Sequence, residues 1–93
     1  MLSELSKLSS NLCSLVDADP ALAVQHAREI DLDRPDRVNW MSLRAATLVN
    51  AGASLGRRDA IDEGVELYRE LHDLYPTVDI TYNLANGLVE AAN

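Results

Sequence analysis

Two segments of thirteen residues decide the fold: residues 64–76, GVELYRELHDLYP, and residues 23–35, AVQHAREIDLDRP. Each begins with a small residue, has apolar or aromatic residues four and seven positions later, and ends in a proline. Spacings of four and three place side chains on one face of an α-helix. Because the residue before a proline disfavours helical geometry, the repetition predicts two equivalent amphipathic helices that each end near their proline.

Helical periodicity continues on both sides of these segments. Asp19 and Thr77 are typical N-cap residues, and Pro20 suits the first turn of a helix. We expect Asp59 to be a third N-cap and Gly56 to end a helix in left-handed geometry. No run shows the alternation of a strand. The expected helices cover about residues 3–16, 20–31, 38–55, 59–75 and 78–92.

The third and fifth expected helices also match each other. Leu48-Val49-Asn50 and Leu84-Ala85-Asn86 share the pattern Leu-x-Asn at a separation of 36 residues. The pattern therefore indicates alternating helices of two types. A recurring helix pair is the signature of a repeat array, in which each pair buries its apolar face against its neighbours.

These residues resemble the tetratricopeptide repeat. The run 82–86, YNLAN, is similar to the start of that family's first helix, and Gly56 is similar to its turn glycine. Gly64, Tyr68 and Pro76 are similar to its second-helix signature. The resemblance covers about residues 19–93. It implies an all-α fold of antiparallel helical hairpins, stacked as a short right-handed solenoid of five helices.

The chain departs from that family in three respects. Leu71 stands where the family usually has alanine, and Trp40 lies too early to match its hallmark tryptophan. The two prolines are 41 residues apart, whereas the family period is about 34 residues. The longer period implies about one additional turn in each helix.

Composition supports an all-α fold and excludes several classes of protein. Leu and Ala contribute 27 of the 93 residues, and both favour helices over strands. The chain length is that of one domain, residues 1–93. No segment is apolar over the length needed to span a bilayer, and a signal peptide is not recognisable, so we expect a cytoplasmic protein without membrane contact. The net charge of −7 argues against direct binding to nucleic acid.

Catalytic and metal-binding patterns are not evident in the sequence. His26 and His72 lie on different expected helices, and no motif pairs a histidine or cysteine at the spacing of a metal site. Cys13 is the sole cysteine, and we interpret it as a half-buried packing residue. We therefore expect a protein that is not an enzyme and needs no cofactor or metal.

Asparagines inside expected helices are the strongest candidates for a binding site, because asparagine is a poor helix former. In the tetratricopeptide family, first-helix asparagines hold the backbone of an extended peptide. The resemblance implies this role for Asn50, Asn83 and Asn86; a solvent-facing or helix-bridging role is the alternative. Arg44 and Thr47 lie near Asn50 on the same helix and are further candidates for partner binding.

Trp40 allows two interpretations: a packing anchor beside the first helix pair, or an exposed contact for a partner. The leading expectation for the whole chain is a scaffold that binds a partner peptide or helix, basic or neutral in charge. One alternative is an N-terminal regulatory or recruiting module of a larger effector enzyme, including an RNA-cleaving one.

The fifth helix has no following partner, yet it carries an apolar face. We expect the chain to be part of a longer array or protein. Alternatively, the fifth helix is itself a cap, or the chain is a small self-assembling protein in which another copy covers this face in a homo-oligomer.

Overall fold

The computed structural model describes residues 2–92, and the side chains of residues 4–92. The described residues form five α-helices and contain no strand, which confirms the all-α prediction. The helices are α1 (Leu2–Ala18), α2 (Pro20–Arg28), α3 (Arg37–Leu55), α4 (Arg58–Leu74) and α5 (Val78–Ala92).

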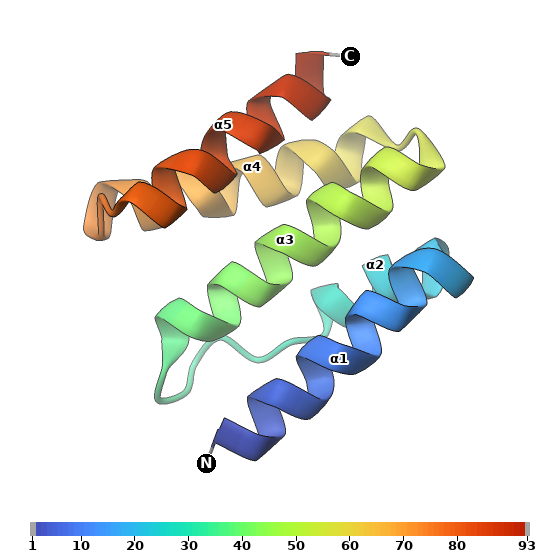
Figure 1. The fold of residues 1–93 in the computed structure, drawn as a ribbon, viewed down its shortest axis with the longest axis horizontal. Helices are drawn as coiled ribbons and strands as arrows, with labels where there is room; N and C mark the ends of the chain where they lie inside the picture. Colours follow the sequence, from blue (N-terminus) through green and yellow to red (C-terminus); the bar gives the residue numbers. More distant parts are fainter. Residues whose placement is uncertain (1, 93) are drawn as a thin grey trace.

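The helices lie in two layers. In Figure 1, α1, α3 and α5 form the near layer, while α2 and α4 lie behind them. Helix α3 packs against both α2 and α4, and α5 packs mainly on α4. The chain reverses direction between α3 and α4 and again between α4 and α5 (Figure 1). The two helix types predicted by the repeat therefore occupy separate layers, and we call the exposed side of the near layer the front face.

Local capping interactions explain why the helices begin and end close to the expected positions. The Leu22 amide donates to the Asp19 carboxylate over 3.2 Å, and the Ile80 amide donates to the Thr77 hydroxyl over 3.2 Å. Gly56 adopts φ 68°, which lets the Arg57 amide donate to the Gly52 carbonyl over 2.8 Å. These contacts satisfy backbone groups that a helix end otherwise leaves without partners.

Helix α2 ends earlier than expected, at Arg28 rather than residue 31. The Glu29 amide donates to the His26 carbonyl and the Ile30 amide to the Ala27 carbonyl, each over 3.2 Å. These three-residue steps tighten the last turn. The tighter turn is compatible with the packing of Ile30 in the core.

The expectation that Asp59 caps α4 is wrong. Helix α4 begins one residue earlier, after the extended Arg57, and Asp59 lies in its first turn. The Asp59 carboxylate accepts hydrogen bonds from Arg57 Nη2 over 2.7 Å and from Arg28 Nη2 over 3.3 Å. The Arg57 guanidinium lowers the pKa of Asp59 to about 2, with Arg28 contributing. The side chain therefore binds mainly cationic neighbours and is not the N-cap of α4.

The core consists of three clusters of buried side chains, all of which include residues of α3. One joins α3 to α4 and α5, a second joins α3 to α2 and the start of α4, and the third contains Leu12, Ile30 and Trp40. Trp40 is only 5% exposed, and the Arg34 guanidinium lies 3.9 Å from the centre of its ring. Of the two interpretations of Trp40, the structure therefore supports the packing anchor and not the exposed contact for a partner.

Close packing of α3 against α4 depends on two glycines. A Cβ atom placed on Gly64 would lie 2.7 Å from Val49 Cγ2 and 2.8 Å from the backbone oxygen of Ala45. A Cβ on Gly52 would lie 3.0 Å from the backbone nitrogen of Ile61. Backbone atoms cannot rotate away as side chains do, so these positions admit only glycine without a shift of the helices.

We predict that Gly64→Ala destabilises the protein by about 1–3 kcal/mol, because overpacking outweighs the ~1 kcal/mol that alanine gains in helix propensity. Urea unfolding followed by circular dichroism measures this difference. Gly87→Ala is the matched control: its Cβ would meet only side chains, the nearest being Val65 Cγ2 at 3.0 Å. It should change the free energy of unfolding by less than about 1 kcal/mol. A Gly64→Ala protein as stable as the wild type contradicts the packing argument.

Candidate functional site

The three candidate asparagines line one pocket. Asn50 comes from α3, and Asn83 and Asn86 come from α5. The whole of α4 lies between these two helices in the sequence, yet both supply amides to the same pocket. The pocket has a volume of about 230 Å³. We call it the asparagine pocket, and its lining residues are Ser42, Ala46, Val49, Asn50, Tyr68, Asn83 and Asn86.

Helical periodicity explains this convergence. Ser42, Ala46 and Asn50 are spaced by four residues along α3, so they form one ridge. Asn83 and Asn86 are spaced by three along α5. Asn50 and Asn86 are exposed and Asn83 is half-buried, so all three amides remain accessible to a ligand.

Buried residues beside the pocket set the distance between its walls. A Cβ atom on Gly87 would lie 3.0 Å from Val65 Cγ2, 3.7 Å from Val49 Cγ2 and 3.9 Å from Tyr68 Cδ2. The glycine therefore allows α5 to lie close to α3 and α4. Tyr68, from the rear layer, is only 3% exposed yet lines the pocket.

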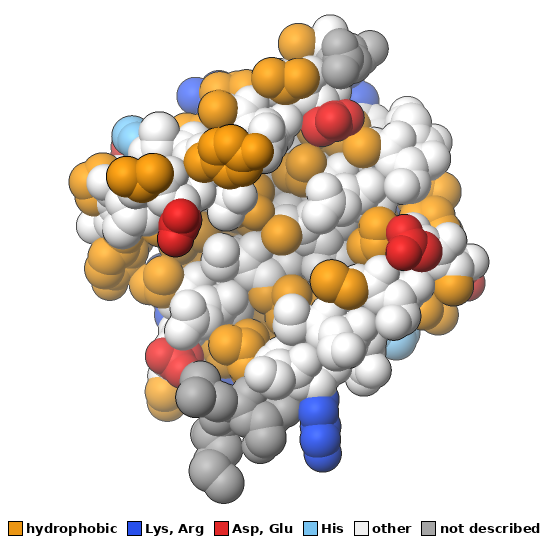
Figure 2. All heavy atoms as spheres, viewed as in Figure 1, with side chains coloured by type: hydrophobic (Ala, Val, Ile, Leu, Met, Phe, Trp, Pro, Cys, Tyr) orange, Lys and Arg blue, Asp and Glu red, His pale blue; other side chains and the backbone are white. Residues whose placement is uncertain are grey.

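A second pocket lies on the other side of the same α3 ridge. Its volume is about 290 Å³ and it shares Ser42 and Ala46 with the asparagine pocket. Leu5 and Ser9 of α1 form its opposite wall. None of the residues that line these two pockets is charged. Figure 2 shows the front face, where apolar and uncharged polar side chains predominate over charged ones.

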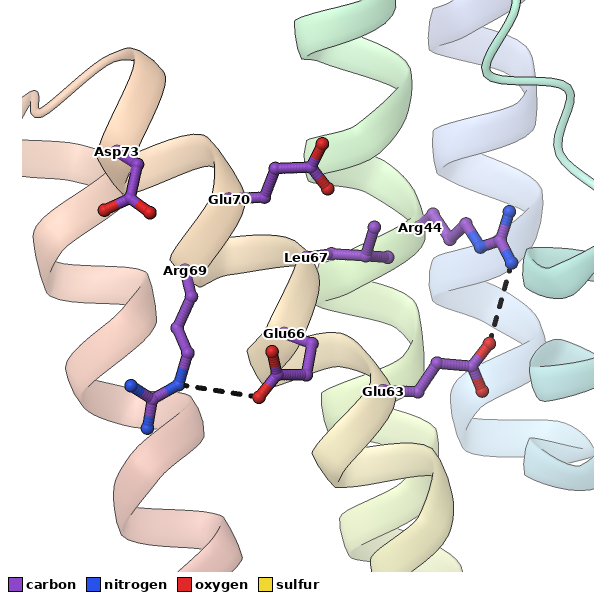
Figure 3. A pocket seen from close by; sticks show the side chains of 7 residues that line it. All are labelled: Arg44, Glu63, Glu66, Leu67, Arg69, Glu70 and Asp73. Carbon is purple, nitrogen blue, oxygen red and sulfur yellow. Dashed lines mark ion pairs between the residues drawn. The ribbon is translucent and has the colours of Figure 1, made fainter.

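The structure does not bring Arg44 and Thr47 to the asparagine pocket, which corrects the expectation drawn from their nearness to Asn50. Thr47 is only 4% exposed, and its hydroxyl donates to the Leu43 carbonyl over 2.8 Å. Arg44 points toward the opposite side of the molecule, where its Nη2 lies 3.6 Å from Glu63 Oε1 (Figure 3). Trp40, the remaining candidate, is buried.

A larger pocket of about 590 Å³ lies behind, where α4 and Arg44 form its lining (Figure 3). Four of the six acidic side chains of α4 line it, and three of these four have a cationic neighbour. Glu63 accepts from Arg28 Nε over 2.8 Å, while Glu66 lies 3.7 Å from Arg69. Glu70 lies 3.7 Å from Arg37. The Arg44 Nε is buried without a hydrogen-bond partner. The pocket is thus a network of ion pairs rather than an unpaired acidic site.

Other candidate features carry no site. Cys13 is exposed, which corrects the expectation that it is a half-buried packing residue. Within the described residues, no three His, Cys, Asp or Glu side chains are grouped so that they could hold a metal ion. Among those same residues, no helix has the length and apolar character needed to cross a membrane.

No protein-family model, curated protein or solved structure matches the chain significantly.

Sequence reasoning missed the polar and aromatic residues that complete the pocket. Ser42 and Ala46 carry a usable signal, because they precede Asn50 by eight and four residues on the same helical face. Tyr68 carries none, since its place beside the pocket depends on how α4 packs against α3 and α5. Burial raises the pKa of the Tyr68 phenol to about 12. The neutral hydroxyl can both donate and accept a hydrogen bond.

The raised pKa of Tyr68 predicts a loss of stability at high pH. The unfolded phenol ionises near pH 10, whereas the folded phenol keeps its proton until about pH 12, so the folded state holds the proton more tightly. The protonated phenol contributes fully to the free energy of unfolding below pH 10. About 1–2 kcal/mol of this contribution is lost as the pH rises from 10 to 12. Unfolding in urea across this pH range measures the loss.

Tyr68→Phe should remove that part of the pH dependence, since phenylalanine has no proton to lose. Tyr75→Phe is the matched control, because Tyr75 is 48% exposed. The argument fails if both variants show the same pH dependence as the wild type.

Proposed function

We propose that this protein is a non-enzymatic interaction module that binds a peptide segment of a partner protein in the asparagine pocket. The observation that carries the proposal is the convergence of Asn50, Asn83 and Asn86 on one accessible pocket from two helices. A cytoplasmic location is part of the proposal.

The chemistry of the amide side chain favours a peptide backbone as the ligand. Each asparagine offers a carbonyl acceptor and an NH₂ donor, which match the N–H and C=O groups of a peptide unit. Asn50 lies on one wall, and Asn83 and Asn86 lie on the other. An extended segment between the walls can therefore form hydrogen bonds on both of its edges without any particular side-chain sequence.

The lining of the pocket favours a partner segment without charge. The front pockets contain amide, hydroxyl and apolar groups but no cation or anion. A charged ligand side chain buried there would lose hydration without gaining an opposite charge. At a net charge of −7, the protein also repels acidic partners over longer distances. We therefore propose a neutral segment, which is narrower than the basic or neutral partner that the sequence predicts.

The two-layer arrangement supports the proposed kinship with tetratricopeptide-like arrays. Helices α3 and α5, which share the Leu-x-Asn pattern, lie in the near layer with α1, and both supply pocket asparagines. Helices α2 and α4, which share the proline-ended pattern, lie behind. The right-handed stacking of such an array remains a prediction.

The triple variant Asn50→Ala, Asn83→Ala, Asn86→Ala tests the proposal. The probe is an array of synthetic peptides in neutral, basic and acidic versions, followed by calorimetric titration of the neutral peptide that binds best. Each lost hydrogen bond costs about 0.5–1.5 kcal/mol, so the triple variant should bind that peptide at least ~10-fold more weakly. Circular dichroism should show an unchanged helical fold, because the three amides have no hydrogen-bond partner among those the structure describes.

A matched control removes three exposed polar groups from α1: Ser10→Ala, Asn11→Ala and Ser14→Ala. This variant should bind the chosen peptide with the affinity of the wild type. Equal binding by the wild type and by the asparagine variant would reject the pocket as the binding site. Preference for the acidic version of the peptide would reject the neutral ligand.

A further inference from the structure

Helix α5 carries an apolar stripe on its exposed side. Val78 is 84% exposed, Tyr82 is 66% exposed and Val89 is 59% exposed, and Ala85 is exposed between them. We call these four residues the α5 stripe. It lies opposite the residues Ile80, Leu84 and Gly87, which face the core. Figure 2 shows apolar side chains gathered over the part of the surface that α5 occupies in Figure 1.

The spacing of the stripe indicates what kind of surface fits it. Val78, Tyr82, Ala85 and Val89 follow one another at steps of four, three and four residues. This is the narrow a/d pattern through which one helix packs along another. None of the four residues is charged, and the two acidic residues of α5, Asp79 and Glu90, lie outside the stripe. The stripe therefore fits an apolar helix rather than a charged partner.

The opposite edge of the molecule is polar. In the described part of α1, the residues on the side away from its buried leucines include Ser6, Ser10, Ser14 and Asp17, all of which are exposed. An array of stacked helices needs such a polar edge where it ends. Head-to-tail stacking of two copies would bury these polar groups against the α5 stripe without hydrogen-bond partners, which costs free energy. Association of two copies is therefore favoured only between their α5 edges.

The α5 stripe is also complementary to itself. When two α5 helices pair in antiparallel directions, with the twofold axis between Tyr82 and Ala85, each Tyr82 lies opposite the small Ala85 of the other copy. Each Val78 then lies opposite the other copy's Val89, and Asp79 flanks the contact on the same side as the other copy's uncharged Asn86. The large Tyr82 meets a small residue, and no charged side chain of either copy lies within the paired stripes. Contacts of this kind, in which one patch meets its own copy, close into a dimer and do not extend into a fibre.

We propose that the protein forms a reversible homodimer through antiparallel packing of the α5 stripes of two copies. The 15 residues of α5 span about 22 Å, so this contact is smaller than the ~800 Å² per partner of stable complexes. The dimer is accordingly weak and concentration-dependent, and the net charge of −7 on each copy opposes it, so salt should strengthen it. It does not rest on the proposed peptide binding, because the stripe does not include the three pocket asparagines.

Sedimentation equilibrium over a series of concentrations, from about micromolar to millimolar, tests the dimer. The wild type should shift from monomer toward dimer as its concentration rises. Tyr82→Ser with Val89→Ser removes apolar contacts without a change of net charge, and it should remain monomeric throughout. Ser10→Ala with Ser14→Ala, on the polar edge of α1, should dimerise as the wild type does. Circular dichroism verifies that every variant is helical.

A charge exchange tests the antiparallel register. Val89→Lys places a cation opposite the other copy's Val78 and should weaken the dimer at least ~10-fold. Adding Val78→Glu places a carboxylate opposite that cation and should restore part of the affinity. In α5 the glutamate lies near the N-terminus and the lysine near the C-terminus, where the helix dipole favours each charge.

Three results overturn the proposal. One is a wild type that remains monomeric at every concentration. Another is equal dimerisation of the wild type and the serine variant, which would place the contact elsewhere. A third is a double variant with Val78→Glu that dimerises no better than Val89→Lys alone, which would exclude the antiparallel register. The alanine variant of the pocket asparagines should still dimerise, so failure of peptide binding and failure of the dimer are separate outcomes.

Discussion

The contact between α3 and α4 is the constraint on which the rest of the structure depends. At Gly64 the two helices approach so closely that a Cβ atom would lie 2.8 Å from the Ala45 carbonyl oxygen. Gly52 permits a second close approach nearer the turn between these helices. Because the contact involves backbone atoms, it determines the relative position of the two layers. The buried Tyr68 and the rear wall of the asparagine pocket follow from that position.

Helix α5 shows how one amphipathic element serves several purposes. Its buried face, with Gly87 at its centre, packs on α4 and brings Asn83 and Asn86 beside α3. Its outer face has no helix to cover it within the described residues, so its apolar side chains remain exposed. The orientation of α5 about its axis thus places its asparagines in the polar pocket and its apolar stripe on the surface.

Charge is distributed unequally between the two sides of the molecule. Four of the acidic residues of α4 line the rear pocket, and ion pairs of Arg28 and Arg44 with acidic residues of α4 join α2, α3 and α4. These side chains are partly exposed, so solvent screens each pair and its contribution to stability is small. Their arrangement still leaves the front pockets without charged lining residues. A surface that recognises backbone amides is consistent with this neutrality.

The sequence by itself determined the local structure and the periodic faces of the helices. Asp19, Gly56 and Thr77 act through hydrogen bonds to residues three to five positions away, so their roles are legible without a structure. The family resemblance and the placement of asparagines inside helices singled out Asn50, Asn83 and Asn86, which the structure brings to one pocket. Tertiary packing decided which way each helix faces, and therefore which neighbours of Asn50 reach the pocket. Tyr68 reaches it because of how α4 packs against α3 and α5. Arg44 and Thr47 do not, because the contacts of α3 with α2 and α4, which are distant in the sequence, set its rotation.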